Sequence, residues 1–141
     1  MYASDYGEDV RRNLVAGNFI TAPQYLHAQR IRRMVRDEFL SIFQKVDVFI
    51  TPTTPMTATK IGSMKCEIEG KEEDLHDNII RFTAPFNVIG APVLALPCGF
   101  SNGGLPIGMQ IVGDVWDEST IIQVGYAYQQ LTDWHERRCE I

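Results

Sequence analysis

The chain has 141 residues, of which 45% are hydrophobic and 22% charged, a balance that excludes a disordered protein and suits one globular domain over residues 1–141. Its net charge of −5 argues against nucleic acid as a partner, because phosphate binding requires a basic surface. No apolar run reaches the roughly 18 residues that cross a bilayer, and residues 1–9 are too acidic and polar for a signal peptide. We expect a cytoplasmic protein that binds neither nucleic acid nor membrane.

The cysteines and histidines form no metal-binding pattern. Cys66, Cys98 and Cys139 are widely spaced and include no Cys-x-x-Cys pair, so neither a zinc ribbon nor a disulfide framework is predicted. Reduced thiols are the simplest interpretation. Residues 74–77 hold two aspartates and a histidine, but without a second cluster this segment is interpreted as a solvated loop. We expect neither a metal nor a cofactor.

Two helices are predicted at the start of the chain. The first covers residues 5–16 and ends at Gly17. Thr21 opens a longer helix, in which Gln24 is placed to complete a capping box. The apolar face of this helix is predicted to comprise Ala28, Ile31, Val35, Phe39, Ile42 and Val46. The cationic cluster of Arg30, Arg32, Arg33 and Arg36 is interpreted as a solvated face.

The middle of the chain is predicted to hold one strand, one loop and one short helix. Residues 47–51 lack polar alternation, which favours a strand buried on both faces, and Pro52 ends it. Residues 56–74 include an acidic run and are predicted to be a polar loop. Residues 75–82 are predicted to form a short helix.

In the last third of the chain, the sequence predicts a hairpin followed by a helix. Strands are expected at 93–97 and 107–112, and the Ser-Asn-Gly-Gly sequence at 101–104 is a turn that makes the pair antiparallel. Asp117 is expected to cap a final helix that runs to about Leu131, with Trp116 packed onto Ile121. The glycine-rich residues 103–108 lack the Lys-Ser/Thr ending of a phosphate cradle and are interpreted as the entrance to the hairpin.

Few residues carry recognisable chemistry. None of the serines lies in a Gly-x-Ser-x-Gly turn, so a serine nucleophile is not indicated. Cys98 ends an apolar strand with no cation near it in sequence, which favours a core thiol. The loop at residues 51–55 carries three threonine hydroxyls just after a strand. It is equally compatible with a rigid turn and with the wall of a ligand pocket.

Five segments, in order along the chain, resemble the C-terminal part of an amidase signature family enzyme. They are residues 25–30, 47–55, 83–92, 96–99 and 104–113, and a helix beginning near residue 117 follows them. The resemblance implies an α/β protein, a fragment of the amidase signature fold in which helices cover a mixed β-sheet. It also implies that residues 1–141 are the C-terminal segment of an amidase signature domain.

Members of that family hydrolyse amides, or move ammonia from glutamine, with a Ser–cis-Ser–Lys triad that lies in their N-terminal and central parts. This chain has no Gly/Ser-rich stretch and no two neighbouring serines, so no catalytic residue is transferred to it. The resemblance therefore implies an amidase that converts a carboxylic amide to acid and ammonia with a triad outside this chain. The chain alone is expected to be inactive, and its ligand, once it is joined to the catalytic part, is a small-molecule amide.

The resemblance also implies substrate-binding residues. Thr83 and Phe86 fall where family members line the substrate channel, and Thr51 and Thr54 are expected nearby. In tRNA-dependent amidotransferases, the A chain typically carries an Asp three residues before the Thr of this motif, whereas this chain has Ile80. This departure favours a general amidase with a more apolar acyl site, and a fragment of the amidotransferase chain is the further alternative.

Two other interpretations remain open. One is a small, non-catalytic α/β binding or interaction protein, and the other is a hydrolase that uses Cys98 or Ser101. The predicted strands are apolar enough to need cover on both sides, and the predicted helices cover only part of them. We therefore expect the chain alone to form a homodimer, aggregate or unfold with low cooperativity, or to bind a complementing polypeptide.

Overall fold

The computed structural model describes residues 5–138. Cys139 and the first four residues, on which the signal-peptide expectation partly rests, lie outside this range. The chain forms two units, and the boundary between Val35 and Arg36 falls inside helix α2 (Ala22–Leu40). Each unit is described by itself.

The first unit contains α1 (Glu8–Gly17) and most of α2, so both predicted helices are present. The second is shorter than predicted: it ends at Leu40, before Ile42 and Val46 of the predicted apolar face, and a short 3₁₀ helix, Ser41–Gln44, follows it. The capping box at the start of α2 differs from the prediction, because the Thr21 hydroxyl donates to the Gln24 side chain. Gln24 Oε1 accepts hydrogen bonds from the backbone N–H of Thr21 and from its hydroxyl, each at 2.9 Å. No residue of α2 is buried, and Ile31 on the predicted apolar face is 47% exposed.

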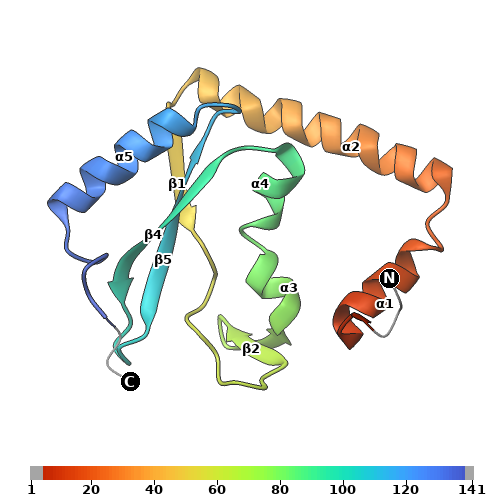
Figure 1. Ribbon diagram of the computed structural model, residues 1–141, viewed down its shortest axis with the longest axis horizontal. Coiled ribbons are helices and arrows are strands. Elements are labelled where there is room, and N and C mark those ends of the chain that lie inside the picture. Colours follow the sequence, from red (N-terminus) through yellow and green to blue (C-terminus); the bar gives the residue numbers. More distant parts are fainter. Residues whose placement is uncertain (1–4, 139–141) are drawn as a thin grey trace. The chain divides into compact units, whose positions relative to one another are not determined.

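The second unit is built around a three-stranded sheet with the order β1-β5-β4. The strands are β1 (Val48–Pro52), β4 (Val93–Phe100) and β5 (Pro106–Gly113), and both pairings are antiparallel. The predicted turn joins β4 to β5, where Ser101 N–H donates to the Leu105 carbonyl and Gly104 takes a φ of +77°. Helix α5 (Glu118–Leu131) lies on one side of the sheet, and α3 (Leu75–Ile80) and α4 (Ala84–Ile89) lie on the other (Figure 1). The α/β class is confirmed.

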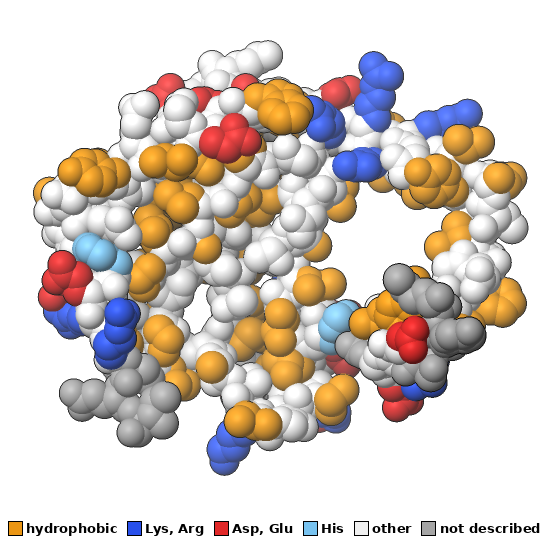
Figure 2. Space-filling model, viewed as in Figure 1, with side chains coloured by type: hydrophobic (Ala, Val, Ile, Leu, Met, Phe, Trp, Pro, Cys, Tyr) orange, Lys and Arg blue, Asp and Glu red, His pale blue; other side chains and the backbone are white. Residues whose placement is uncertain are grey.

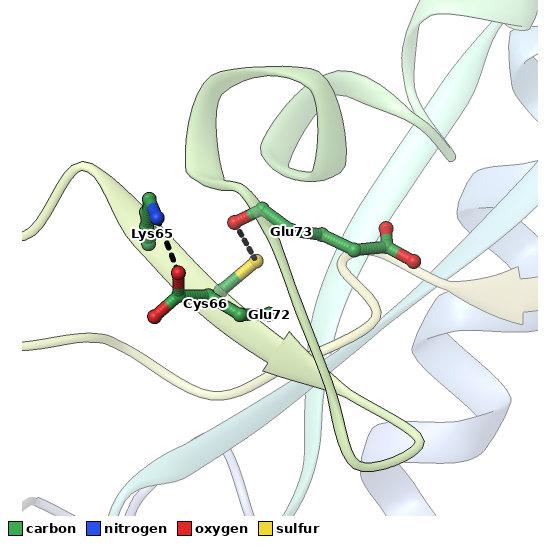
Figure 3. Close-up of polar contacts among 4 residues, drawn as sticks. All are labelled: Lys65, Cys66, Glu72 and Glu73. Atoms are coloured by element: carbon green, nitrogen blue, oxygen red, sulfur yellow. Dashed lines mark hydrogen bonds and ion pairs between the residues drawn. The ribbon is translucent and has the colours of Figure 1, made fainter.

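A hairpin occupies residues 65–74 of the segment 56–74 that was predicted to be a polar loop, and residues 56–64 form no helix or strand. The hairpin consists of β2 (Lys65–Ile68) and β3 (Lys71–Asp74). Glu69 and Gly70 both have positive φ, +51° and +77°, which is the backbone twist of a tight hairpin turn. An ion pair between Lys65 and Glu72 links the strands on their exposed side, and Cys66 is buried (Figure 3). The prediction was wrong because the charges are a cross-strand feature, not the mark of a loop.

Two short helices follow the hairpin, where one helix over residues 75–82 was predicted. Asp74 caps α3 by accepting hydrogen bonds from the backbone N–H groups of His76 and Asp77. Helix α4 carries Pro85 in its first turn, where the missing N–H has no cost, and it ends at Gly90 in the left-handed conformation.

The two faces of the sheet have different cores. On the α5 side, helix and strands approach closely because of two glycines: a Cβ on Gly113 would lie 2.6 Å from Ile121 Cγ2, and one on Gly125 would lie 2.3 Å from Leu94 Cδ2. On the other side four aromatic rings pack with centroids 5.6–6.4 Å apart. They belong to Phe39, Phe43, Phe49 and Phe86.

Two expectations about packing were wrong. Strand β1 is not buried on both faces, because Ile50 is 56% exposed at the edge of the sheet. Trp116 does not pack onto Ile121, because it takes a φ of +68° and is 89% exposed. Asp117 does cap α5, with its carboxylate accepting from the Thr120 backbone N–H and the Ser119 hydroxyl.

Candidate functional site

The four residues expected from the resemblance lie in two segments. Thr51 is in β1, and Thr54 follows that strand. Thr83 precedes α4 as its N-terminal cap residue, and Phe86 lies within that helix. The structure joins these two segments through one buried side chain, that of Gln110 in β5.

Gln110 is 1% exposed. Its Nε2 group donates to three oxygens: the hydroxyl of Thr51 at 2.9 Å, the carbonyl of Pro52 at 3.1 Å and the carbonyl of Phe82 at 2.7 Å. This residue was not predicted as part of a site. A signal was available, because Gln110 is the one polar side chain in the apolar run 107–112, and a buried amide must find partners.

Thr54 lies beside a cavity of about 580 Å³. Its hydroxyl donates to the Met56 carbonyl at 2.7 Å, which fixes the turn after β1. The residues that line the cavity come from this turn, from the β2–β3 hairpin and from the start of the α3–α4 connection. They are Pro52, Thr54, Pro55, Glu67, Ile68, Glu69, Lys71, Glu73, Arg81 and Phe82.

Glu73 and Arg81 bring opposite charges to this cavity. The Glu73 carboxylate points away from Cys66 (Figure 3) and accepts a hydrogen bond from Asn78 Nδ2 at 2.9 Å. Arg81 is an exposed residue, and among residues 5–138 no ion-pair partner of its side chain is found. The lining of the cavity therefore combines apolar residues with charged residues of both signs, most of which come from the hairpin.

Helix α4 begins two residues after the lining residue Phe82, and two contacts hold it in place. Phe86 is 6% exposed and packs against Phe39 and Phe49. Arg36 Nη1 donates to the Ile89 carbonyl at 2.7 Å and so places a positive charge at the C-terminus of α4. Arg36 thus departs from the solvated face predicted for the arginine cluster.

None of the candidate nucleophiles is paired with a base in the described part of the chain. Burial, followed by the nearby Glu73 and Asp74, raises the pKa of the Cys66 thiol and disfavours the reactive thiolate. Cys98 Sγ donates to the Ile107 carbonyl at 3.5 Å. Ser101 Oγ accepts from the Leu105 N–H at 3.2 Å and thereby stabilises the hairpin turn.

The polar segment 74–77 also takes part in the fold. Among residues 5–138, no three His, Cys, Asp or Glu side chains converge as metal ligands do, and the carboxylate of Asp74 is used to cap α3. In the same range, no helix combines the length and the apolar character needed to cross a bilayer.

Comparison with known proteins gives one consistent result. Residues 1–122 match the amidase family. The chain is 43% identical to the A subunit of the Glutamyl-tRNA(Gln) amidotransferase of Synechococcus sp. (strain JA-3-3Ab), and the match covers 96% of this chain and 26% of that protein.

Solved structures agree. A crystal structure of an amidase superposes with a TM-score of 0.83 at 28% identity, covering 89% of this chain and 29% of that one. The 6-aminohexanoate cyclic dimer hydrolase superposes with a TM-score of 0.80 at 26% identity, covering 96% of this chain and 31% of that one. This chain thus spans less than a third of the length of these three proteins. It belongs to the amidase family.

Proposed function

We propose that this chain is the C-terminal part of an amidase that hydrolyses a carboxylic amide to acid and ammonia. The catalytic Ser–cis-Ser–Lys triad lies in polypeptide outside this chain. The observation that carries the proposal is the family match over residues 1–122 in a chain that covers only 26% of its Synechococcus relative. In support, the hydroxyls of Ser41, Ser101 and Ser119 contact a carbonyl, a backbone N–H and a capping carboxylate, respectively, and no lysine.

The chain contributes the wall of the acyl pocket. Of the four residues, Thr54 alone is among those that line the cavity. We assign Thr51, Thr83 and Phe86 a supporting role: Thr51 accepts a hydrogen bond from Gln110, Thr83 precedes α4 and Phe86 lies within that helix. A carboxamide requires no cofactor for hydrolysis by a nucleophile and an oxyanion hole, so the wall supplies shape and polarity rather than chemistry. The ligand is a small-molecule amide.

Exposed apolar side chains support the proposal that another polypeptide packs against this chain. Hydrophobic side chains lie open on the surface (Figure 2), and they include Ile50 at 56% exposure, Ile122 at 58% and Leu131 at 85%. Exposed apolar area of this kind marks interaction surfaces. In the proposal, the polypeptide that carries the triad covers this surface, and residues 1–141 are the C-terminal segment of the combined domain.

Complementation tests the proposal. The chain would be expressed alone and together with the N-terminal part of the Synechococcus relative, cut where its match to this chain begins. Ammonia release would be measured with acetamide, benzamide and hexanamide. We expect hydrolysis only when both polypeptides are present. Hydrolysis by this chain alone would contradict the proposal, and absence of activity in both samples would favour the non-catalytic binding protein.

The A chain of a tRNA-dependent amidotransferase is the second candidate, favoured by the 43% identity to the Synechococcus relative. Against it stands Ile80, a side chain that is 41% exposed where such chains typically carry Asp. An apolar side chain offers no partner to the charged amino group of glutamine. The same complementation assay, run with glutamine, distinguishes the two candidate functions. Preference for glutamine over hexanamide supports the amidotransferase, and the reverse preference supports the general amidase.

A further inference from the structure

The Gln110 side chain makes hydrogen bonds beyond the contact with its cross-strand neighbour. It is one of two buried polar side chains among residues 5–138, the other being Asn78. In the antiparallel ladder Gln110 is directly opposite Thr51, so the two side chains lie on the same face of the sheet. A cross-strand contact with the Thr51 hydroxyl is therefore expected, whereas the bond to Phe82 reaches an element outside the sheet.

The orientation of the Gln110 amide is determined by its partners. The carbonyls of Pro52 and Phe82 can only accept hydrogen bonds, so the Nε2 group and not the carbonyl oxygen must face them. The two N–H groups are shared among three acceptors within 3.1 Å. To make the same hydrogen bonds, another side chain would need the length of glutamine and two N–H donors at its end.

These bonds connect segments that are far apart in sequence. Pro52 lies 58 residues before Gln110 and leads into the turn that holds Thr54. Phe82 lies 28 residues before it and leads directly into Thr83 and α4. Pro52, Thr54 and Phe82 all line the same cavity. The length of one glutamine side chain therefore sets the separation of two sides of that cavity.

We propose that Gln110 is a positioning residue that clamps the end of β1 to the start of α4 and thereby determines which acyl groups the cavity accepts. This inference rests on the proposed function, because it assumes that the cavity receives the acyl group of an amide. Gln110 itself contacts no substrate. Its effect is on the width of the cavity, so it acts on the discrimination between small and bulky acyl groups.

The first test compares substrates in the complemented enzyme. Gln110→Met keeps the side-chain volume but removes both donors, and Gln110→Glu keeps the shape but places a carboxylate oxygen against two carbonyls. The matched control is Gln123→Met, at an exposed position in α5. We expect both Gln110 variants to change the ratio of kcat/KM for acetamide and benzamide by about tenfold, and the control to keep that ratio. An equal loss for every amide would make Gln110 a structural residue only and would overturn the inference.

The second test does not depend on catalysis. Hydrogen exchange of this chain, followed by mass spectrometry, reports Thr53 N–H, which donates to the Gly108 carbonyl, and Asn87 N–H, which donates to the Thr83 carbonyl at the start of α4. In Gln110→Met we expect faster exchange in peptides covering both groups and no change in β4. Acceleration in only one of the two segments, or throughout the chain, would overturn the clamp. If the complemented wild-type enzyme is inactive, the proposed function fails while hydrogen exchange still decides the clamp.

Discussion

Arg36 shows how one side chain can decide the position of a helix. Its guanidinium bonds the carbonyl of Ile89, a residue that is fully buried. The bond satisfies a carbonyl at the end of a helix, where intrahelical donors are absent, and it places positive charge at the negative end of the helix dipole. Helix α4 is thus held at its C-terminus by Arg36 and just before its N-terminus by Gln110.

We expect Arg36→Met to destabilise the second unit by about 1.5–3 kcal/mol, the usual range for loss of a hydrogen bond to a charged group. Methionine preserves most of the aliphatic stem, so the loss reports the guanidinium. Urea unfolding of the complex with the complementing N-terminal polypeptide, monitored by circular dichroism, measures this difference in the free energy of unfolding. Arg30→Met, at an exposed position, is the control and should leave stability unchanged. Equal midpoints for Arg36→Met and the wild type would show that the Ile89 carbonyl needs no such partner.

At the scale of whole elements, the cap of α5 makes stability depend on pH. Hydrogen bonds from Thr120 and Ser119 lower the pKa of the Asp117 carboxyl in the folded state. A group whose pKa is lowered by folding contributes stability above its unfolded pKa, and this contribution is lost as the pH falls through the folded pKa. The contribution of Asp117 is therefore complete at neutral pH and disappears in acid.

We expect Asp117→Ala to lower Tm at pH 7 because the first turn of α5 loses its acceptor. The difference in Tm between this variant and the wild type should shrink as the pH falls through the acid range. Asp117→Asn is the matched control, since asparagine caps well but does not titrate. Thermal melts of the complexes with the N-terminal polypeptide, at a series of pH values, measure both variants. A difference in Tm that stays constant down to strongly acid pH would refute the assignment.

The elements that could be predicted from sequence are those specified by local residues. The β4–β5 hairpin follows from the turn at 101–104, and the start of α5 follows from Asp117. The β2–β3 hairpin was missed because acidic residues dominate its composition, although Cys66 and Ile68 alternate with exposed residues as in a strand. The role of Gln110 was missed for a different reason: two of its acceptors are backbone carbonyls 28 and 58 residues away, and no local pattern reports them.

At the scale of the whole molecule, exposed apolar side chains dominate the behaviour we expect. The described chain places only six hydrophobic residues in its core, and the largest of them that are fully buried are Ile89, Ile111 and Val112. Many more lie open, including Trp116 at 89% and Met64 at 75% exposure. Burial of such surface is the main driving force for association.

We therefore expect the chain alone to self-associate or to unfold over a broad temperature range. Addition of the complementing N-terminal polypeptide should convert it to a one-to-one complex with a sharper transition. Sedimentation velocity and calorimetry measure these two properties. A monomer that melts in a single cooperative step, and that does not bind the added polypeptide, would contradict the expectation.

Three of the hydrogen bonds that hold the candidate wall in place end on peptide carbonyls: those of Pro52 and Phe82 for Gln110, and that of Ile89 for Arg36. Every amino acid supplies the same carbonyl. Apart from Thr54 and Glu73, whose side chains bond the Met56 carbonyl and Asn78, the side chains that line the cavity can therefore be exchanged one by one while these three bonds are kept. Substrate preference can then change without loss of the fold. New amide preferences are therefore best sought by varying the lining positions rather than Gln110 or Arg36.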